Sequence, residues 1–224
     1  MKGRDRILLD LDDTLYACAP AETAASAALI GAVAKALDLA PRDAEAAWAS
    51  ARRSVKERID GRGSSHSRLL YAAELVHAVG RPDALANVRP WERMYWQAFV
   101  SVAKVRPRAR AFLETVRRAG AKVAIVSDLT LEVQLYKLET FGLLPLIDAL
   151  ATSEEVPLDK PDEAIFRLAM ARLRTTADAC IMVGDRDDRD GEGARRLNVP
   201  YFRIESSDTE GLGFDTLLHQ LGMP

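Results

Sequence analysis

The stretch "ILLDLDDTLYA", residues 7–17, joins an apolar run to three closely spaced carboxylates, Asp10, Asp12 and Asp13. These carboxylates repel one another and resist burial, so a stable fold gains little by placing them at the end of a buried segment. A divalent cation would offset the repulsion. On a strand, Asp10 and Asp12 point to the same face and can address one substrate. The stretch therefore predicts a buried strand ending in a metal or catalytic site, although a polar strand end has the same pattern.

Two further apolar segments also end in an aspartate. Together with the first they are "RILLDLD" (6–12), "AKVAIVSD" (121–128) and "ACIMVGD" (179–185). Such runs without alternation are typical of buried parallel strands. Ligands of open α/β sheets bind outside the carboxyl ends of the strands, so we expect the three ends to converge on one crevice. "IDALATS" (147–153) and "PYFRIE" (200–205) are weaker strand candidates.

Helical patterns alternate with these strands, at 106–120, 130–142, 161–173 and 191–198. The alternation predicts an α/β fold with a doubly wound parallel sheet. Residues 17–104 differ, because four helix-like blocks follow one another there without a strand pattern. We expect an all-helical domain at 17–104, inserted into an α/β core domain formed by residues 1–16 and 105–224. Trp91, Tyr95 and Trp96 are spaced for one face of a helix in that insertion, which indicates core packing.

The composition excludes several classes of protein. The chain of 224 residues is 48% hydrophobic and 29% charged, with a net charge of −2, which gives no electrostatic reason to bind a nucleic acid polymer or an anionic membrane. No apolar stretch approaches the ~20 residues that span a bilayer. The two cysteines, Cys18 and Cys180, have no zinc-binding spacing and are far apart. We therefore expect a cytoplasmic protein.

Two polar residues, Ser127 and Lys160, lie next to predicted elements: Ser127 at the end of a strand and Lys160 just before a helix. The Ser127 hydroxyl could bind a phosphoryl oxygen, or it could cap the following helix, with Thr130 as an alternative cap. Lys160 precedes Pro161, which we place in the first turn of a helix. Its ammonium could offset the negative charge of the crevice, or it could be solvated.

The stretch "GDRDDRDGEGARRL", residues 184–197, carries the remaining acidic residues. Asp185 ends a strand and Asp190 lies in the loop before the next helix. Two carboxylates in such a loop suit Mg²⁺, which takes few protein ligands and keeps several waters. An acidic surface turn is the alternative, and Asp187 and Asp188 fit that description.

Four motifs follow one another along the chain: Asp10 to Thr14, Ser127, Lys160, and the stretch 184–197. In this order they resemble the motifs of the haloacid dehalogenase-like (HAD) superfamily of hydrolases. The resemblance covers the sheet domain and the helical insertion, and it implies a Rossmann-like core with a helical cap. It also implies that Asp10 is the nucleophile, forming an aspartyl-phosphate, and that Asp12 is the general acid/base. The other implied roles are phosphate binding by Thr14, Ser127 and Lys160, and Mg²⁺ binding by Asp10, the backbone carbonyl of Asp12, Asp185 and Asp190.

Two residues depart from the superfamily pattern. Asp128 stands where Asn or Thr often follows the serine, and it could repel phosphate or turn away to pair with an arginine. Arg189 stands where Asn is common before Asp190, which leaves the role of Asp190 open.

The resemblance implies a Mg²⁺-dependent phosphatase acting on a small phosphorylated metabolite, as a monomer or homodimer. Halide departs without a proton and would not need Asp12, so Asp12 favours phosphoryl transfer over 2-haloacid dehalogenation. A phosphomutase acting on a sugar phosphate and a non-catalytic binding module with the same fold are further alternatives.

The insertion is expected to act as a cap that selects the substrate. Arg62, His66 and Arg68 lie at or beside a glycine-containing loop. They could contact an anionic or sugar-like substrate, or they could be solvated charges at helix ends. Asp13 is expected only to orient its loop by accepting hydrogen bonds from backbone amides.

Overall fold

Five parallel strands form one sheet in the computed structural model, which describes residues 3–223. The strands are β1 (Arg6–Leu9), β2 (Lys122–Ser127), β3 (Ala149–Thr152), β4 (Cys180–Gly184) and β5 (Tyr201–Arg203). Their order across the sheet is β3-β2-β1-β4-β5. The predicted α/β fold with a parallel sheet is therefore confirmed, and the two weaker strand candidates are strands as well. The strand order reverses beside β1, which is where ligands bind in open sheets of this kind.

The register brings the ends of the three central strands to the same level. Leu9 at the end of β1 pairs with Ile125 of β2 on one side and with Val183 of β4 on the other. The pairing continues one residue further, since the Asp10 amide donates a hydrogen bond to the Val183 carbonyl at 2.9 Å. Polar residues that follow these strands therefore start from neighbouring positions on one edge of the sheet.

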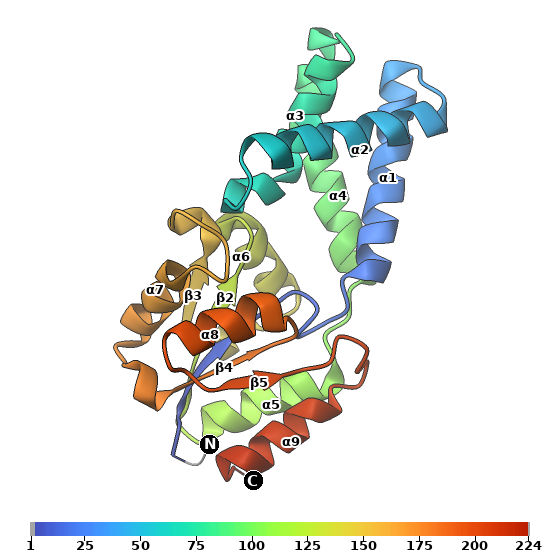
Figure 1. The fold of residues 1–224 in the computed structure, drawn as a ribbon. Helices are drawn as coiled ribbons and strands as arrows, with labels where there is room; N and C mark the ends of the chain where they lie inside the picture. The colour runs from blue at the N-terminus through green and yellow to red at the C-terminus, as the bar shows by residue number, and fades with distance from the viewer. Residues whose placement is uncertain (1–2, 224) are drawn as a thin grey trace. The chain divides into compact units, whose positions relative to one another are not determined.

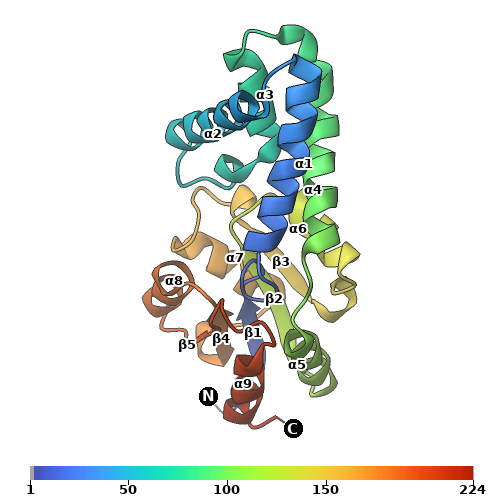
Figure 2. The ribbon, with the colours of Figure 1, turned by 90° about the vertical axis from the view of Figure 1, so that its right-hand side faces the viewer.

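Helices cover both faces of this sheet. They are α5 (Pro107–Arg118), α6 (Leu131–Thr140), α7 (Glu163–Leu173), α8 (Glu192–Arg196) and α9 (Leu212–Leu221). The helices α7 and α8 lie on one face and α5 lies on the other (Figures 1 and 2). The α9 helix packs against α5, where the rings of Phe112 and Phe214 have centroids 5.1 Å apart.

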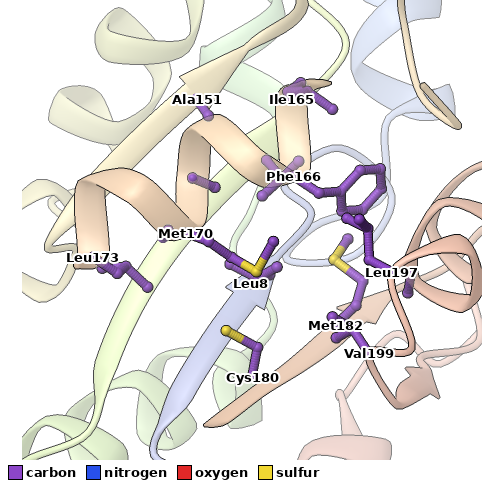
Figure 3. Close-up of a cluster of buried hydrophobic side chains, with 14 residues drawn as sticks. Leu8, Ala151, Ile165, Phe166, Met170, Leu173, Cys180, Met182, Leu197 and Val199 are labelled. Carbon is purple, nitrogen blue, oxygen red and sulfur yellow. The ribbon is translucent and has the colours of Figure 1, made fainter. Parts of the chain in front are cut away.

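A buried apolar cluster joins α7 to the sheet (Figure 3). Phe166 and Met170 of α7 face Leu8 of β1 and Met182 of β4, and all four are buried. Apolar residues line both faces of the central strands, so the strands read in the sequence as continuous apolar runs rather than alternating ones.

Two helices differ from the predicted pattern. The predicted helix at 161–173 begins at Glu163, because Asp162 is its N-cap and accepts a hydrogen bond from the Ala164 amide at 2.9 Å. Pro161 thus lies outside the helix, and its placement in the first turn was wrong. The α9 helix was not predicted.

The residues from Ala19 to Ala103 form a compact unit of their own, while residues up to Cys18 and from Lys104 onward form the sheet-containing unit. The regular structure described within this stretch is entirely helical. Its helices are α1 (Ala19–Leu37), α2 (Pro41–Arg58), α3 (Arg68–Ala78) and α4 (Val88–Val102), with 3₁₀ turns at Gly63–His66 and Pro82–Asn87. Within the unit, α1 packs along α4 and α2 packs along α3.

Aromatic side chains fill the interior of the helical unit. Trp91, Tyr95 and Trp96 of α4 are at most 4% exposed, so their interpretation as core residues is confirmed. Tyr95 and Trp96 meet edge to face, with ring centroids 5.0 Å apart.

Arg68 does not behave as a solvated helix-end charge. Its side chain is only 10% exposed and pairs with Glu22 at 3.0 Å. The guanidinium carbon lies 5.1 Å from the ring centroid of Tyr95 and 5.0 Å from that of Trp96. Cation–π contacts with these rings therefore stabilise a charge that burial would otherwise disfavour.

Among the described residues, no single helix has the length and apolar character needed to cross a membrane, although α1 and α2, bent by 111° at their junction, pass that test as a pair.

Candidate active site

Lys160 lies at the centre of a buried group of charges at the edge of the sheet. Its Nζ donates to Asp10 Oδ1 and to Asp190 Oδ1, each at 2.7 Å, and to the Val126 carbonyl at 3.1 Å. The three charged residues are at most 5% exposed. Burial lowers the pKa of a lysine, but Asp10 and Asp190 outweigh this and raise the pKa of Lys160 well above its usual value, so the side chain carries a proton. The solvated interpretation of Lys160 is wrong.

Asp10, Asp185 and Asp190 offer a set of metal ligands. One carboxylate oxygen from each lies within 4.8 Å of the other two. Burial, with Asp190 and Asp13 nearby, raises the pKa of Asp185 to about 6. Burial also raises the pKa of Asp10, and Lys160 opposes that effect. The three carboxylates supply hard oxygen ligands that fit a divalent cation such as Mg²⁺, and such a cation would stabilise the charged forms of Asp10 and Asp185.

The position of Asp190 depends on Gly184 and on the turn that follows β4. Asp187–Gly191 form a single π-helical turn, and the Arg186 amide donates to Asp190 Oδ2 at 3.2 Å. A Cβ atom on Gly184 would overlap the Asp190 carboxylate, well inside van der Waals contact. The glycine thus leaves the space into which Asp190 folds back towards Lys160.

Thr14 joins the same cluster. Its hydroxyl donates to Asp10 Oδ2 at 2.9 Å and lies 3.4 Å from Asp185 Oδ1. The structure therefore brings together Asp10, Thr14, Lys160, Asp185 and Asp190, all of which were predicted from the sequence as site residues.

Asp12 makes a different set of contacts, on the side of α6. Lys137 Nζ donates to both of its carboxylate oxygens, at 2.7 and 3.1 Å, and Gln134 Nε2 donates to Oδ2 at 2.8 Å. The Tyr16 hydroxyl donates to Oδ1. Burial raises the pKa of Asp12, but Lys137, Tyr16 and Gln134 more than offset it and hold the pKa well below its usual value. Asp12 is consequently ionised, and its carboxylate is not part of the three-carboxylate set.

Ser127 is connected to Asp12 through Gln134. The Gln134 side-chain amide donates both to the Ser127 hydroxyl and to Asp12. Neither Ser127 nor Thr130 caps α6: Thr130 occupies the N-cap position without a side-chain cap bond. Instead, Glu154 accepts a hydrogen bond from the Leu131 amide at 2.8 Å. The capping interpretation of both residues was wrong.

Sequence reasoning missed Gln134 and Lys137. Both are buried on α6, beside Leu138. A signal was present, since Gln134, Lys137, Leu138 and Phe141 have the i, i+3, i+4, i+7 spacing of one helix face. Two polar residues on an otherwise apolar face need buried partners, and here those partners are Asp12 and Ser127.

The loop after β1 is held by further hydrogen bonds. The Cys18 amide donates to Asp13 Oδ1 at 2.8 Å, as expected for a loop-orienting aspartate. Asp13 has a positive φ of 62°, a conformation that aspartate tolerates better than most residues. Arg106, which was also missed, is 2% exposed and donates to the carbonyls of Asp13 at 2.7 Å and Ser206 at 2.8 Å.

Asp128 and Arg189, the two residues that depart from the superfamily pattern, contact each other. Arg189 Nη1 donates to Asp128 Oδ2 at 3.0 Å, so Asp128 is paired with an arginine. The neighbouring acids Asp187 and Asp188 are exposed and pair with Arg195 and Arg186, which confirms the surface-turn interpretation for these two.

Comparison with known proteins identifies the family. Residues 5–198 match the family model for haloacid dehalogenase-like hydrolases. Ribulose-1,5-bisphosphate 5-phosphatase of Halopiger xanaduensis is 35% identical over 90% of this chain and 85% of its own length. Glyceraldehyde 3-phosphate phosphatase of Methanocaldococcus jannaschii is 29% identical over 88% of this chain and 83% of its own length.

A solved structure has the same fold. The crystal structure of a HAD phosphatase from Thermococcus onnurineus matches with a TM-score of 0.75 at 22% identity, over 99% of this chain and 98% of the other. The chain thus belongs to the haloacid dehalogenase-like hydrolase family, as a phosphoric monoester hydrolase.

Proposed function

We propose that this chain is a Mg²⁺-dependent phosphatase that hydrolyses a small phosphorylated metabolite through an aspartyl-phosphate on Asp10. The observation that carries the proposal is the Lys160 ammonium, 2.7 Å from both Asp10 and Asp190 and next to three carboxylates that can share a cation. A phosphomonoester dianion is repelled by a carboxylate nucleophile, and these positive charges would reduce that repulsion.

The residues of the cluster would act in sequence. An Asp10 oxygen attacks phosphorus and displaces the substrate alkoxide, while Thr14, Ser127 and Lys160 donate hydrogen bonds to the phosphoryl oxygens. Asp12 gives a proton to the leaving oxygen. It then accepts a proton from the water that hydrolyses the aspartyl-phosphate and regenerates Asp10. Because Asp12 is ionised in the contacts it makes here, it would take up the first proton from solvent water as the substrate enters.

Asp10, Asp185 and Asp190, with the backbone carbonyl of Asp12, would hold Mg²⁺. When bound, the ion supplies positive charge that stabilises the transferring phosphoryl group. The presence of Asp12 favours phosphoryl transfer over dehalogenation, because a halide leaves without a proton and would not need this residue.

We further propose that the substrate is a phosphorylated sugar and that the helical unit, Ala19–Ala103, is the cap that selects it. The names of the two relatives support the substrate class, since both act on sugar phosphates. The two cysteines, Cys18 and Cys180, are free and buried, which supports a reducing compartment such as the cytoplasm. Either a monomer or a homodimer is compatible with a site whose proposed residues all come from one chain.

The test is phosphate release from an aryl phosphate and a panel of sugar phosphates that includes ribulose 1,5-bisphosphate and glyceraldehyde 3-phosphate. We expect turnover with Mg²⁺, none with chelator, and a loss of at least about 1,000-fold in Asp10→Asn, which keeps the shape but lacks the nucleophile. Asp188→Asn is the matched control, since Asp188 is exposed in the same acidic stretch and pairs with Arg186. Turnover that survives in Asp10→Asn, or in chelator, would refute the mechanism.

A further inference from the structure

Asp128 and Arg189 surround the backbone of Lys160. Asp128 Oδ1 accepts a hydrogen bond from the Lys160 amide at 2.8 Å, and Arg189 Nη1 donates to the Lys160 carbonyl at 3.1 Å. The same Nη1 donates to Asp128 Oδ2 at 3.0 Å, which closes a ring of three contacts. Both polar backbone atoms of Lys160 are therefore held by side chains from other segments.

The two side chains that hold the Lys160 backbone, Asp128 and Arg189, each adjoin a proposed site residue in the chain. Asp128 follows Ser127 at the end of β2, and Arg189 precedes Asp190 in the π-helical turn after β4. The ring thus joins the three segments that carry Ser127, Lys160 and Asp190. Asp128 is the more buried partner, with 13% of its side chain exposed against 32% for Arg189.

The position of the Lys160 ammonium depends on where this backbone lies. A lysine side chain is flexible and its ammonium is a point charge without preferred directions, so its own geometry does not fix the contacts that it makes. Yet Nζ lies 2.7 Å from both Asp10 and Asp190. An anchored Cα limits the side-chain conformations that satisfy both contacts, and a displacement of about 1 Å in a reacting group can reduce a rate 100-fold.

We propose that Asp128 and Arg189 are a coupled pair of positioning residues that fixes the backbone of Lys160 and, through it, the ammonium that meets the phosphoryl group. This inference rests on the role proposed for Lys160. It gives the two departures from the family pattern one explanation, because the two side chains pair with each other: Asp128 is the nearer carboxylate to Arg189, at 3.0 Å, whereas Asp159 lies 4.0 Å away.

A double-mutant cycle tests the coupling. Asp128→Asn keeps the shape of the side chain and removes its charge, and Arg189→Met keeps the apolar stem and removes the donors. We expect each single variant to lower kcat by about 10- to 100-fold and to weaken the binding of inorganic phosphate to the Mg²⁺-loaded protein about 10-fold. The double variant should lose no more than the worse single variant, because either change already opens the ring.

Phosphate binding separates a positioning role from a structural one. Titration calorimetry reports the dissociation constant of the folded protein, so a variant that merely unfolds more easily would lower the thermal midpoint and leave that constant unchanged. Asp188→Asn, in the same turn, should stay within twofold of the parent in both measurements. If Asp128→Asn does not fold, Asp128→Glu replaces it, since it keeps the charge and displaces the carboxylate by one methylene group.

The outcomes distinguish this inference from the proposed function. Two results would overturn the pair as a positioning device even if the parent is an active phosphatase. One is a double variant in which the losses of kcat and of phosphate affinity multiply. The other is single variants whose kcat and phosphate affinity stay within twofold of the parent. If the parent hydrolyses no ester but its phosphate binding shows the expected coupling, the proposed function fails and the positioning role stands. If the parent neither hydrolyses esters nor binds phosphate, both are refuted.

Discussion

Burial and the nearby charges of Asp190 and Asp13 raise the pKa of Asp185, one of the three carboxylates of the proposed metal site, to about 6. Folding raises the pKa of this carboxyl, so the folded state holds the proton more tightly than the unfolded state does. The carboxyl therefore favours the metal-free fold at pH values below the pKa of the unfolded chain, and this stabilisation is lost as the pH rises through about 6. The free protein thus holds at neutral pH a charge that it disfavours, and a bound cation would remove that disadvantage.

Mg²⁺ affinity is therefore expected to depend on pH. Below about pH 6 the ion must displace a proton from Asp185, so the apparent dissociation constant should rise roughly tenfold per pH unit, whereas above pH 7 this group no longer contributes. Titration calorimetry between pH 5 and 8 measures the effect. Asp185→Asn is the comparison, and it should bind Mg²⁺ weakly throughout. Equal affinity of the parent at pH 5 and pH 8 would contradict the assignment of Asp185 as a ligand.

Lys137 is expected to stabilise the fold through Asp12. Lys137→Met leaves the Asp12 carboxylate without its cation, and breaking a buried pair in this way costs about 3–5 kcal/mol, with the lower end expected because 28% of the Asp12 side chain is exposed. The folded pKa of Asp12 is depressed, so the contribution is present above about pH 4 and is lost as the pH falls below it. Urea unfolding at pH 7 and at about pH 2 measures both effects.

The matched control for Lys137 is a surface lysine. Lys122 pairs with Asp148 at 2.8 Å but is 52% exposed, so Lys122→Met should cost less than about 1 kcal/mol. In an Asp12→Asn background, Lys137→Met should cost much less than it does alone. Equal costs in the two backgrounds would mean that Lys137 acts through packing rather than through its charge.

At the scale of elements, two glycines near β4 and α8 serve different purposes. A Cβ on Gly184 would overlap the Asp190 carboxylate, whereas a Cβ on Gly193 would overlap the ring of Phe166 in the apolar core. Gly184→Ala should displace Asp190 from Lys160, weaken Mg²⁺ binding and lower kcat roughly 100-fold, while the strand keeps its backbone pairing. Gly193→Ala should instead overpack the core and cost about 1–3 kcal/mol, with Mg²⁺ affinity unchanged. Calorimetric titration and urea unfolding of both variants check this contrast, and equal Mg²⁺ affinities would refute the role of Gly184.

Elements whose pattern is set locally were predictable from the sequence. The central strands are buried on both faces and so appear as apolar runs, and the meeting of parallel strand ends at one edge predicts that Asp10 and Asp185 lie together. The α9 helix was missed because a helix of ten residues is marginal by itself and depends on its packing against α5. The start of α7 was misplaced because both Pro161 and Asp162 are compatible with a helix N-terminus, and only the capping bond distinguishes them.

The supporting residues of the site were harder to predict, because their role depends on tertiary packing. Gln134 and Lys137 belong to the apolar stripe of α6, and their burial against Asp12 follows from where that helix lies. Arg106 is one of several arginines around the start of α5, and only its three backbone carbonyl acceptors set it apart. Pairing of Asp128 with an arginine was one of the two predicted alternatives, but a single sequence does not indicate that the partner is Arg189, 61 positions away.

At the scale of the whole molecule, the residues of the proposed metal site and the tryptophans belong to different units. Asp10, Asp185 and Asp190 lie in the sheet-containing unit, whereas Trp48, Trp91 and Trp96, the three tryptophans of the chain, lie in the helical unit. Each unit buries an apolar core of its own, so the chain need not unfold in a single transition.

Tryptophan fluorescence and calorimetry should therefore respond differently to Mg²⁺. At a concentration 100-fold above its dissociation constant, a ligand stabilises the unit that binds it by about 2.7 kcal/mol, which raises the midpoint of that transition by roughly 5–10 °C. We expect calorimetry to show this shift for the sheet-containing unit, while the fluorescence midpoint, which reports the helical unit, stays within about 1 °C. In Asp185→Asn both midpoints should be insensitive to Mg²⁺, because the ion no longer has its full ligand set. If Mg²⁺ shifts the fluorescence midpoint of the parent as much as the calorimetric one, the two units unfold as one cooperative body and their separate cores do not confer separate stability.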